Sequence, residues 1–96
     1  MLIYRKIKVG RKIIKAICFP LSSKNLIVIR GKRGYIMCGY INLKVAEMFK
    51  DVAVKVTGVS SITDVLKARV NDLTSFAKRL GIYKNQPIKD VLKIIA

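Results

Sequence analysis

Two alternating segments on either side of a glycine constrain the fold of this 96-residue chain most strongly. Residues 2–9 alternate between an apolar face and a second, mostly basic one, with Ile3, Ile7 and Val9 against Tyr4, Lys6 and Lys8. Gly10-Arg11 follows, where a two-residue hairpin turn needs a positive φ. Residues 12–19 then alternate again, with Ile13, Ile17 and Phe19 against Lys12, Ile14, Ala16 and Cys18. A period of two is typical of β-strands, so the pattern predicts a β-hairpin.

The second strand of this hairpin is partly apolar on both faces, which predicts cover on both sides. A chain of this length buries only about two-thirds of its unfolded surface, yet 52% of its residues are hydrophobic. Self-association is the simplest way to cover the surplus. We therefore expect a homo-oligomer, with a subunit contact that hides Ile13, Ile14, Ile17 and Phe19.

The rest of the chain predicts three further strands and four helices. The strands are expected at residues 26–29, 35–38 and 52–57. Helices are expected after Asn42, after Ser61, from Asn71 or Asp72 to the stop at Gly81, and from Pro87 onward. The order ββββαβααα predicts a single two-layer α+β domain over residues 1–96, with an antiparallel meander at its N-terminal end.

The fourth strand, the first helix and the fifth strand form a βαβ unit, so a right-handed crossover should leave the two strands parallel. Their carboxyl ends then share one edge of the sheet, each just before a helix N-terminus, where an anion is favoured. The candidate ligand or anion residues at this edge are Cys38, Gly39, Gly58, Ser60 and Ser61. The alternative is purely structural: the glycines allow tight turns, the thiol packs as a small apolar group and the serines cap.

Catalysis and metal binding have little support in the sequence. Cys38 is a weak candidate nucleophile, because the chain has no His to serve as its base. Cys18 and Cys38 lack CxxC spacing, so we predict no metal site and no cofactor.

Charge gives the strongest functional signal. The first acidic residue is Glu47, and eleven Lys and Arg precede it in a chain of net charge +15. A field of this sign attracts polyanions, either nucleic acid or an anionic membrane surface. The alternative is a general compositional bias toward Lys and Ile. Lys or Arg interrupts every apolar stretch, so we expect no transmembrane segment, no signal peptide and a cytoplasmic protein.

Bases concentrate at two predicted turns and on the first strand. The nucleic-acid-binding candidates are Arg5, Lys8, Arg11, Lys12, Arg30, Lys32 and Arg33. Flexible glycines at positions 31 and 34 would let this second turn approach phosphates closely. The favoured hypothesis is a non-enzymatic protein that binds the RNA backbone, with RNA preferred over DNA and the ribosome as a candidate place of binding. The alternative is an oligomeric small-molecule or anion binder, or an enzyme, that uses Cys38 and Ser60.

Four short motifs resemble a known family. They are residues 25–28 (Asn-Leu-Ile-Val), residues 34–39 (Gly-Tyr-Ile-Met-Cys-Gly), Gly58-Val59 before a serine-started helix, and residues 80–82 (Leu-Gly-Ile). They resemble the YunC-like family of small bacterial and archaeal proteins, a domain of unknown function (DUF1805). The resemblance implies an α+β fold whose N-terminal β-region mediates tetramerisation, and it supplies no activity, cofactor or catalytic residue. The charge of +15 departs from the more balanced family pattern.

Overall fold

A computed structural model describes residues 2–38 and 42–96 as an α+β fold built on a six-stranded mixed sheet. The strands follow sequence order across the sheet: β1 (Ile3–Val9), β2 (Lys12–Pro20), β3 (Asn25–Arg30), β4 (Tyr35–Met37), β5 (Ala53–Lys55) and β6 (Asp72–Leu73). The helices are α1 (Leu43–Met48), α2 (Ile62–Lys67), α3 (Ser75–Arg79) and α4 (Ile88–Ile95). The predicted α+β class is confirmed.

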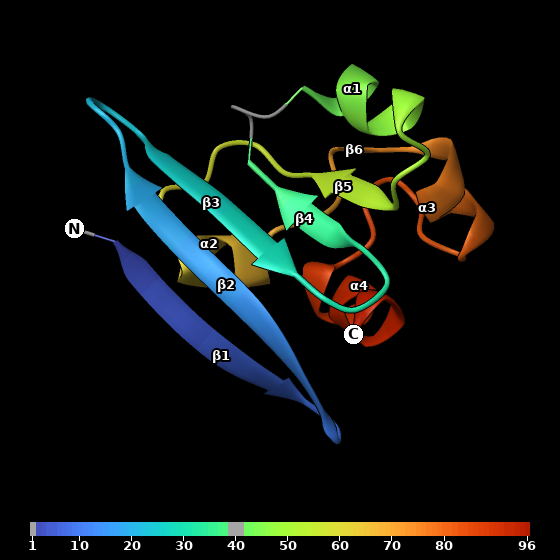
Figure 1. Cartoon of the computed structure of the whole chain (residues 1–96), viewed down its shortest axis with the longest axis horizontal. Helices are drawn as coiled ribbons and strands as arrows, with labels where there is room; N and C mark the ends of the chain where they lie inside the picture. The colour runs from blue at the N-terminus through green and yellow to red at the C-terminus, as the bar shows by residue number, and fades with distance from the viewer. Residues whose placement is uncertain (1, 39–41) are drawn as a thin grey trace.

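The first four strands form the predicted antiparallel meander, and β1 is an edge strand (Figure 1). The next pair, β4 and β5, is parallel, as the βαβ unit predicted. Because the meander is antiparallel, the β1–β2 and β3–β4 turns lie at the same end of the sheet. No helix in the described part of the chain has the length and apolar character needed to cross a bilayer.

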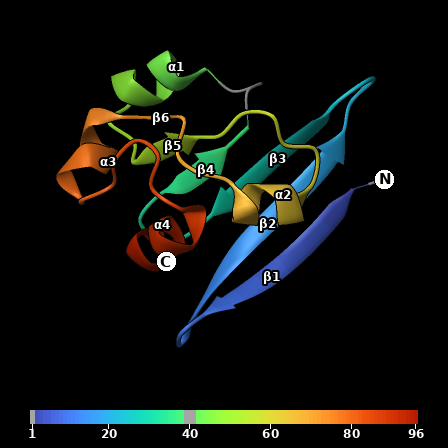
Figure 2. The ribbon, with the colours of Figure 1, turned by 180° about the vertical axis from the view of Figure 1, so that it is seen from behind.

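One face of the sheet carries the main core. Figure 2 shows α2 and α4 lying over this face. Their apolar residues Ile62, Val65, Ile88, Val91 and Ile95 are buried with the inward side chains of the strands, Ile14, Ala16, Cys18, Ile27, Ile29, Ile36 and Val54. Ile14 is therefore fully buried within its own chain, so its inclusion among the side chains left for a subunit contact was wrong.

Within residues 2–38 and 42–96, the second face of the sheet is covered by a helix at one end only. Ala46 of α1 packs with Met37 and Ala53 in a small cluster over β4 and β5. The arrangement there has three layers, whereas the helices of the described residues lie on only one side of β1, β2 and β3 (Figures 1 and 2).

The region of residues 70–80 differs from the sequence prediction of one continuous helix. Asp72 and Leu73 pair with Lys55 and Val54 as β6, and α3 begins only at Ser75. Thr74 accounts for this break, because its buried hydroxyl donates to the carbonyl of Asp51 at 2.6 Å and accepts the N–H groups of Ala53 and Ala77. Because Thr74 both caps α3 and bonds to β5, strand β6 ends and the helix begins at this residue. The observed order is thus ββββαβαβαα.

Candidate nucleic-acid interface

The uncovered side of β1, β2 and β3 is the candidate interface, and we call it the open face. Its side chains are Tyr4, Lys6 and Lys8 of β1, Ile13, Lys15, Ile17 and Phe19 of β2, and Leu26, Val28 and Arg30 of β3. Ile13, Tyr4 and Phe19 are 60, 52 and 50% exposed. Exposed apolar patches of this kind mark binding surfaces in folded proteins.

Three cations form a row across the open face. Lys6 pairs with Lys15, and Lys15 pairs with Arg30, each directly opposite its neighbour in the sheet register. All three are exposed. Facing residues on adjacent strands have Cβ atoms only about 4.5–5.5 Å apart, so like charges in this position repel. We call these three residues the cation row.

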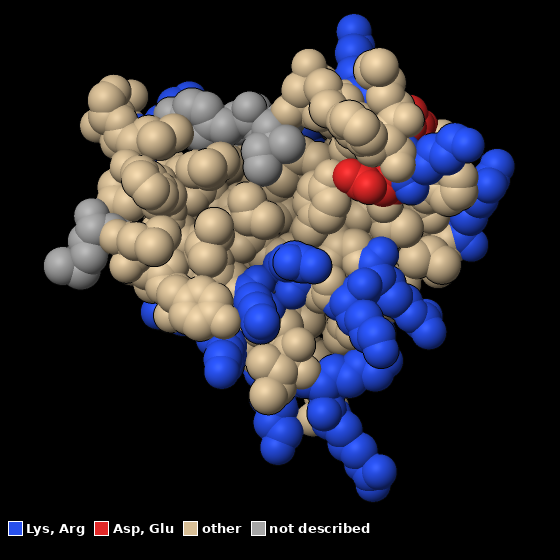
Figure 3. Space-filling view, viewed as in Figure 1, with Lys and Arg blue, Asp and Glu red and all other residues tan. Residues whose placement is uncertain are grey.

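Two more bases adjoin the cation row. Lys8 lies two residues nearer the β1–β2 turn than Lys6, opposite Ile13. Lys32 joins Lys15 and Arg30 around a shallow hollow of about 230 Å³ that Ile13 and Gly31 complete. In Figure 3 the basic side chains gather at the end of the molecule that carries the two turns, while most atoms visible at the opposite end of the same face belong to uncharged residues. The open face thus has a basic half and an apolar half.

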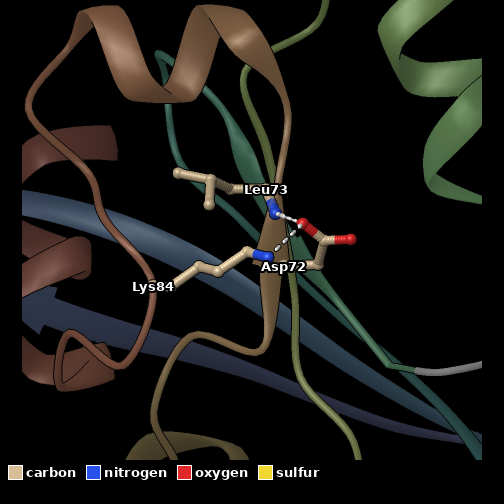
Figure 4. A network of polar contacts seen from close by, with 3 residues as sticks. All are labelled: Asp72, Leu73 and Lys84. Carbon is tan, nitrogen blue, oxygen red and sulfur yellow. Dashed lines mark hydrogen bonds and ion pairs between the residues drawn. The ribbon is translucent and has the colours of Figure 1, made fainter.

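Four of the five acidic side chains, those of Glu47, Asp51, Asp64 and Asp72, are engaged elsewhere. Figure 4 shows the one ion pair found in residues 2–38 and 42–96, between Lys84 Nζ and Asp72 Oδ1 at 4.0 Å, with the N–H of Leu73 donating to the same oxygen. Asp51 accepts the hydroxyl of Tyr35 at 2.8 Å. Burial, followed by this hydrogen bond and the negative charge of Asp51, raises the pKa of Tyr35 to about 12.

Glu47 and Asp64 are likewise bound to serines. The Ser75 hydroxyl and N–H donate to Glu47 and lower its pKa. The N–H and hydroxyl of Ser60 do the same for Asp64. The described acids thus leave the cation row without an ion-pair partner, and its positive charge faces solvent.

The structure divides the seven predicted binding residues between two sides of the sheet. Lys8 and Arg30 lie on the open face and Lys32 adjoins it. Arg5 and Lys12 project from the opposite face, and Lys12 Nζ donates to the carbonyl of Ala96 at 3.3 Å. The remaining two belong to turns, Arg11 between β1 and β2 and Arg33 between β3 and β4.

Sequence reasoning missed Lys6 and Lys15. The signal was present in the alternation, because Lys6 shares a strand face with Tyr4 and Lys8. A two-residue turn at Gly10-Arg11 also fixes the register that sets Lys6 opposite Lys15. The sequence prediction favoured bases at the turns and named only Arg5 and Lys8 on the first strand.

The glycines of the β3–β4 turn have a different role from the predicted one. A Cβ on Gly31 would lie within 3.0 Å of the Ile95 backbone, and a Cβ on Gly34 would lie equally close to Val52. Arg33 N–H also donates to the Ile95 carbonyl at 2.8 Å. Gly31 therefore allows close packing of the turn against α4 and Gly34 allows close packing against Val52, just before β5, so neither supplies flexibility.

The second predicted site lies where β4 and β5 end, as expected for parallel neighbours. A cleft of about 590 Å³ is lined by Ser23, Lys24, Asn25, Cys38, Thr57, Gly58, Val59 and Ser60. Ser61 adjoins it, and Gly39 lies outside the described residues. The predicted juxtaposition of Cys38, Gly58 and Ser60 is therefore observed.

Polar groups at this cleft already have protein partners. The N–H and hydroxyl of Ser60 both donate to Asp64 Oδ2, at 3.1 and 2.9 Å, and Ser61 Oγ accepts the N–H of Asp64. Both donors of Ser60, just before the N-terminus of α2, are thus already paired with a carboxylate of the chain itself. Cys38 is only 4% exposed, and its Sγ accepts the N–H of Ile27 at 3.4 Å and donates to the Asn25 carbonyl at 3.7 Å. These contacts match the structural alternative for Cys38, Ser60 and Ser61.

Fold and surface together define a small α+β protein whose N-terminal meander leaves one basic and apolar sheet face bare. Residues 37–95 match the domain of unknown function DUF1805, so the chain belongs to this family, as its motifs predicted. A protein of unknown function from Thermoplasma acidophilum has a similar crystal structure, with a TM-score of 0.96 and 30% sequence identity over 100% of this chain and 94% of that one. A comparison with curated proteins finds no match.

Proposed function

We propose that this protein is a non-enzymatic nucleic-acid-binding protein that holds an RNA backbone on the basic half of its open face. The cation row carries this proposal. Three like charges directly opposite one another on adjacent strands cost stability in the free protein. The same three charges become favourable when anionic groups bind between their side chains.

Phosphate is the anion that these side chains fit best. A guanidinium group such as that of Arg30 binds two phosphate oxygens at once, and Lys supplies a mobile point charge beside it. Successive phosphates of one strand give each base its own partner and release condensed counterions. The contacts would be independent of sequence, because the backbone carries no base information. A site on the ribosome or on free cytoplasmic RNA would serve equally.

The test compares two triple variants that each remove three positive charges. One is Lys6→Gln, Lys15→Gln and Arg30→Gln in the cation row. The matched control is Lys67→Gln, Lys89→Gln and Lys93→Gln, whose exposed bases lie on α2 and α4, over the opposite face. Affinity for a labelled oligoribonucleotide is measured by fluorescence anisotropy over a series of salt concentrations.

In the cation-row variant we expect the slope of log affinity against log salt to become less negative by about 2. Each of the three lost phosphate contacts accounts for about 0.7 of this change. The control should change that slope by less than half as much. Equal effects of the two variants would show that the charge acts diffusely, and binding of anionic vesicles in preference to RNA would contradict the proposal. Absorbance of the purified protein at 260 and 280 nm gives a first check for copurified RNA.

The cleft at the ends of β4 and β5 supports a second candidate function, a small-anion or small-molecule site. Its volume of about 590 Å³ lies within the usual range for ligand pockets, roughly 300–1,000 Å³, and Lys24 supplies a cation. Inorganic phosphate should then raise the melting temperature of the wild-type protein and leave that of Lys24→Ala unchanged. Equal shifts in both would remove this candidate.

A further inference from the structure

We infer that the RNA bound on the open face is single-stranded and that its unpaired bases stack on Tyr4 and Phe19. This inference rests on the proposed function and names the class of its ligand. It concerns the apolar half of the open face, which phosphate contacts leave unused.

The sheet register orders the open face from basic to apolar. Beginning at the turns, Lys8 lies beside Ile13, and the cation row comes next. Tyr4 then lies beside Ile17 and Val28, and Phe19 lies beside Leu26. Alternate residues of a strand are about 7 Å apart, so the first aromatic ring stands one such step from the cation row. The surface on which bases would stack therefore lies next to the side chains that would bind phosphates.

Both rings are available for stacking. Tyr4 and Phe19 are about half exposed, and they are diagonal neighbours, because Tyr4 faces Ile17, two positions from Phe19. Diagonal neighbours in a sheet are about 7–8 Å apart. Each ring therefore offers a surface of its own, and sheet aromatics of this kind stack successive bases in single-strand-binding proteins.

A duplex does not use this surface. Its bases are already stacked on one another, and proteins contact its phosphates and 2′-hydroxyls. Ile17, Tyr4 and Phe19 would then lose water against a polar backbone without gaining a partner. A second copy of the chain fits the apolar half but not the basic half, since its own cation row would add like charge to the same interface.

The experiment measures affinity for single- and double-stranded RNA of the same length, about 10–16 nucleotides, with three proteins. They are the wild type, the double variant Tyr4→Leu with Phe19→Leu, and the control Tyr83→Leu with Phe49→Leu. The control residues are 57 and 73% exposed and lie outside the open face. Leu keeps the apolar surface and removes the ring, so folding should persist, and circular dichroism checks it.

We expect the wild type to prefer the single strand and the double variant to lose roughly tenfold in affinity for each ring. The salt slope should stay the same, because no phosphate contact is removed. The control should bind as the wild type does. Tyr4→Trp gives a direct readout in a chain without tryptophan, and single-stranded RNA should quench its fluorescence while a duplex does not.

Three results would overturn the inference. Equal affinity for both forms of RNA with an intact salt slope would leave the proposed function standing and remove the stacking platform. Unchanged single-strand affinity in the double variant would do the same. A change in oligomeric state in place of RNA affinity, seen by light scattering, would assign the face to a second copy. Absence of any RNA binding by the wild type would instead end the proposed function itself.

Discussion

The two ends of the sheet differ in how their faces are covered. Strands β4 and β5 are covered on both faces, by α1 on one side and by the main core on the other. Around them the acids Asp51, Glu47 and Asp72 are bound to neighbouring residues. The meander β1–β3 has one covered face and one bare face on which like charges stand opposite each other. We therefore expect substitutions at the covered end to cost more stability than substitutions on the bare face, which is the face that the proposed function uses.

The largest contrast should appear on replacing Thr74. Its buried hydroxyl joins Asp51, Ala53 and Ala77, so Thr74→Val leaves two buried N–H groups without an acceptor and should cost about 2–4 kcal/mol of unfolding free energy. Urea denaturation measures this. Thr74→Ser should keep most of the stability. On the bare face, Ile13→Thr should change stability by no more than about 0.5 kcal/mol, and a larger loss there would break the comparison.

A second contrast lies within the turns of the meander. Gly31→Ala forces a methyl group against the backbone of Ile95, and we expect a loss of about 3 kcal/mol, since backbone cannot move aside as a side chain does. Gly10 has a φ of +62° and no neighbour near its Cβ position. Gly10→Ala should therefore lower the unfolding free energy by only about 1 kcal/mol, which is the cost of placing a non-glycine residue in the left-handed conformation. Similar losses in the two variants would mean that the β3–β4 turn does not rest on α4.

The Tyr35 hydroxyl allows the covered end to be tested by pH. Its pKa is raised to about 12 by burial and by Asp51, whereas an unfolded tyrosine titrates near 10. Between these values the unfolded chain binds fewer protons than the folded one, so stability falls as the pH rises. The contribution is complete below about pH 10 and is lost by about pH 12. Thermal melts of Tyr35→Phe should show a shallower decline than the wild type over this window.

The smallest expected effect has the opposite sign. Lys15→Gln removes the middle charge of the cation row and should stabilise the free protein by about 0.2–1 kcal/mol at low ionic strength. Salt screens exposed charges, so the gain should shrink as salt is added. Lys67→Gln on α2 is the control and should have little effect at either salt concentration. Destabilisation by Lys15→Gln would mean that the row is neutralised by partners within the protein.

Periodicity predicted the long elements well because each one has a single dominant pattern. The hairpin of β1 and β2, the parallel pair β4 and β5 and the last helix all follow from alternation, helical spacing or crossover handedness. β6 was missed because two residues carry no periodicity, and a tertiary contact of Thr74 decides where α3 begins. Helical spacing of Leu73 with Phe76 and Ala77 gave the misleading signal.

The candidate sites show the same division. Sequence placed Cys38, Gly58 and Ser60 at one sheet edge correctly, because strand order and direction determine it. It could not show that Asp64 already occupies the donors of Ser60, since side-chain hydrogen bonds depend on coordinates. It also treated the turns as the basic site, although the cation row needs only the register of three strands.

The position of β1 at the sheet edge affects how the protein behaves in bulk solution. Its outer backbone is open to pairing with another sheet, and the charges of Arg5, Lys6 and Lys8 keep such encounters apart. A bound polyanion cancels part of that repulsion while the edge stays open. If RNA is that polyanion, as we propose, colloidal stability should follow the ratio of RNA to protein, with turbidity highest near charge balance and clear solutions on either side of it.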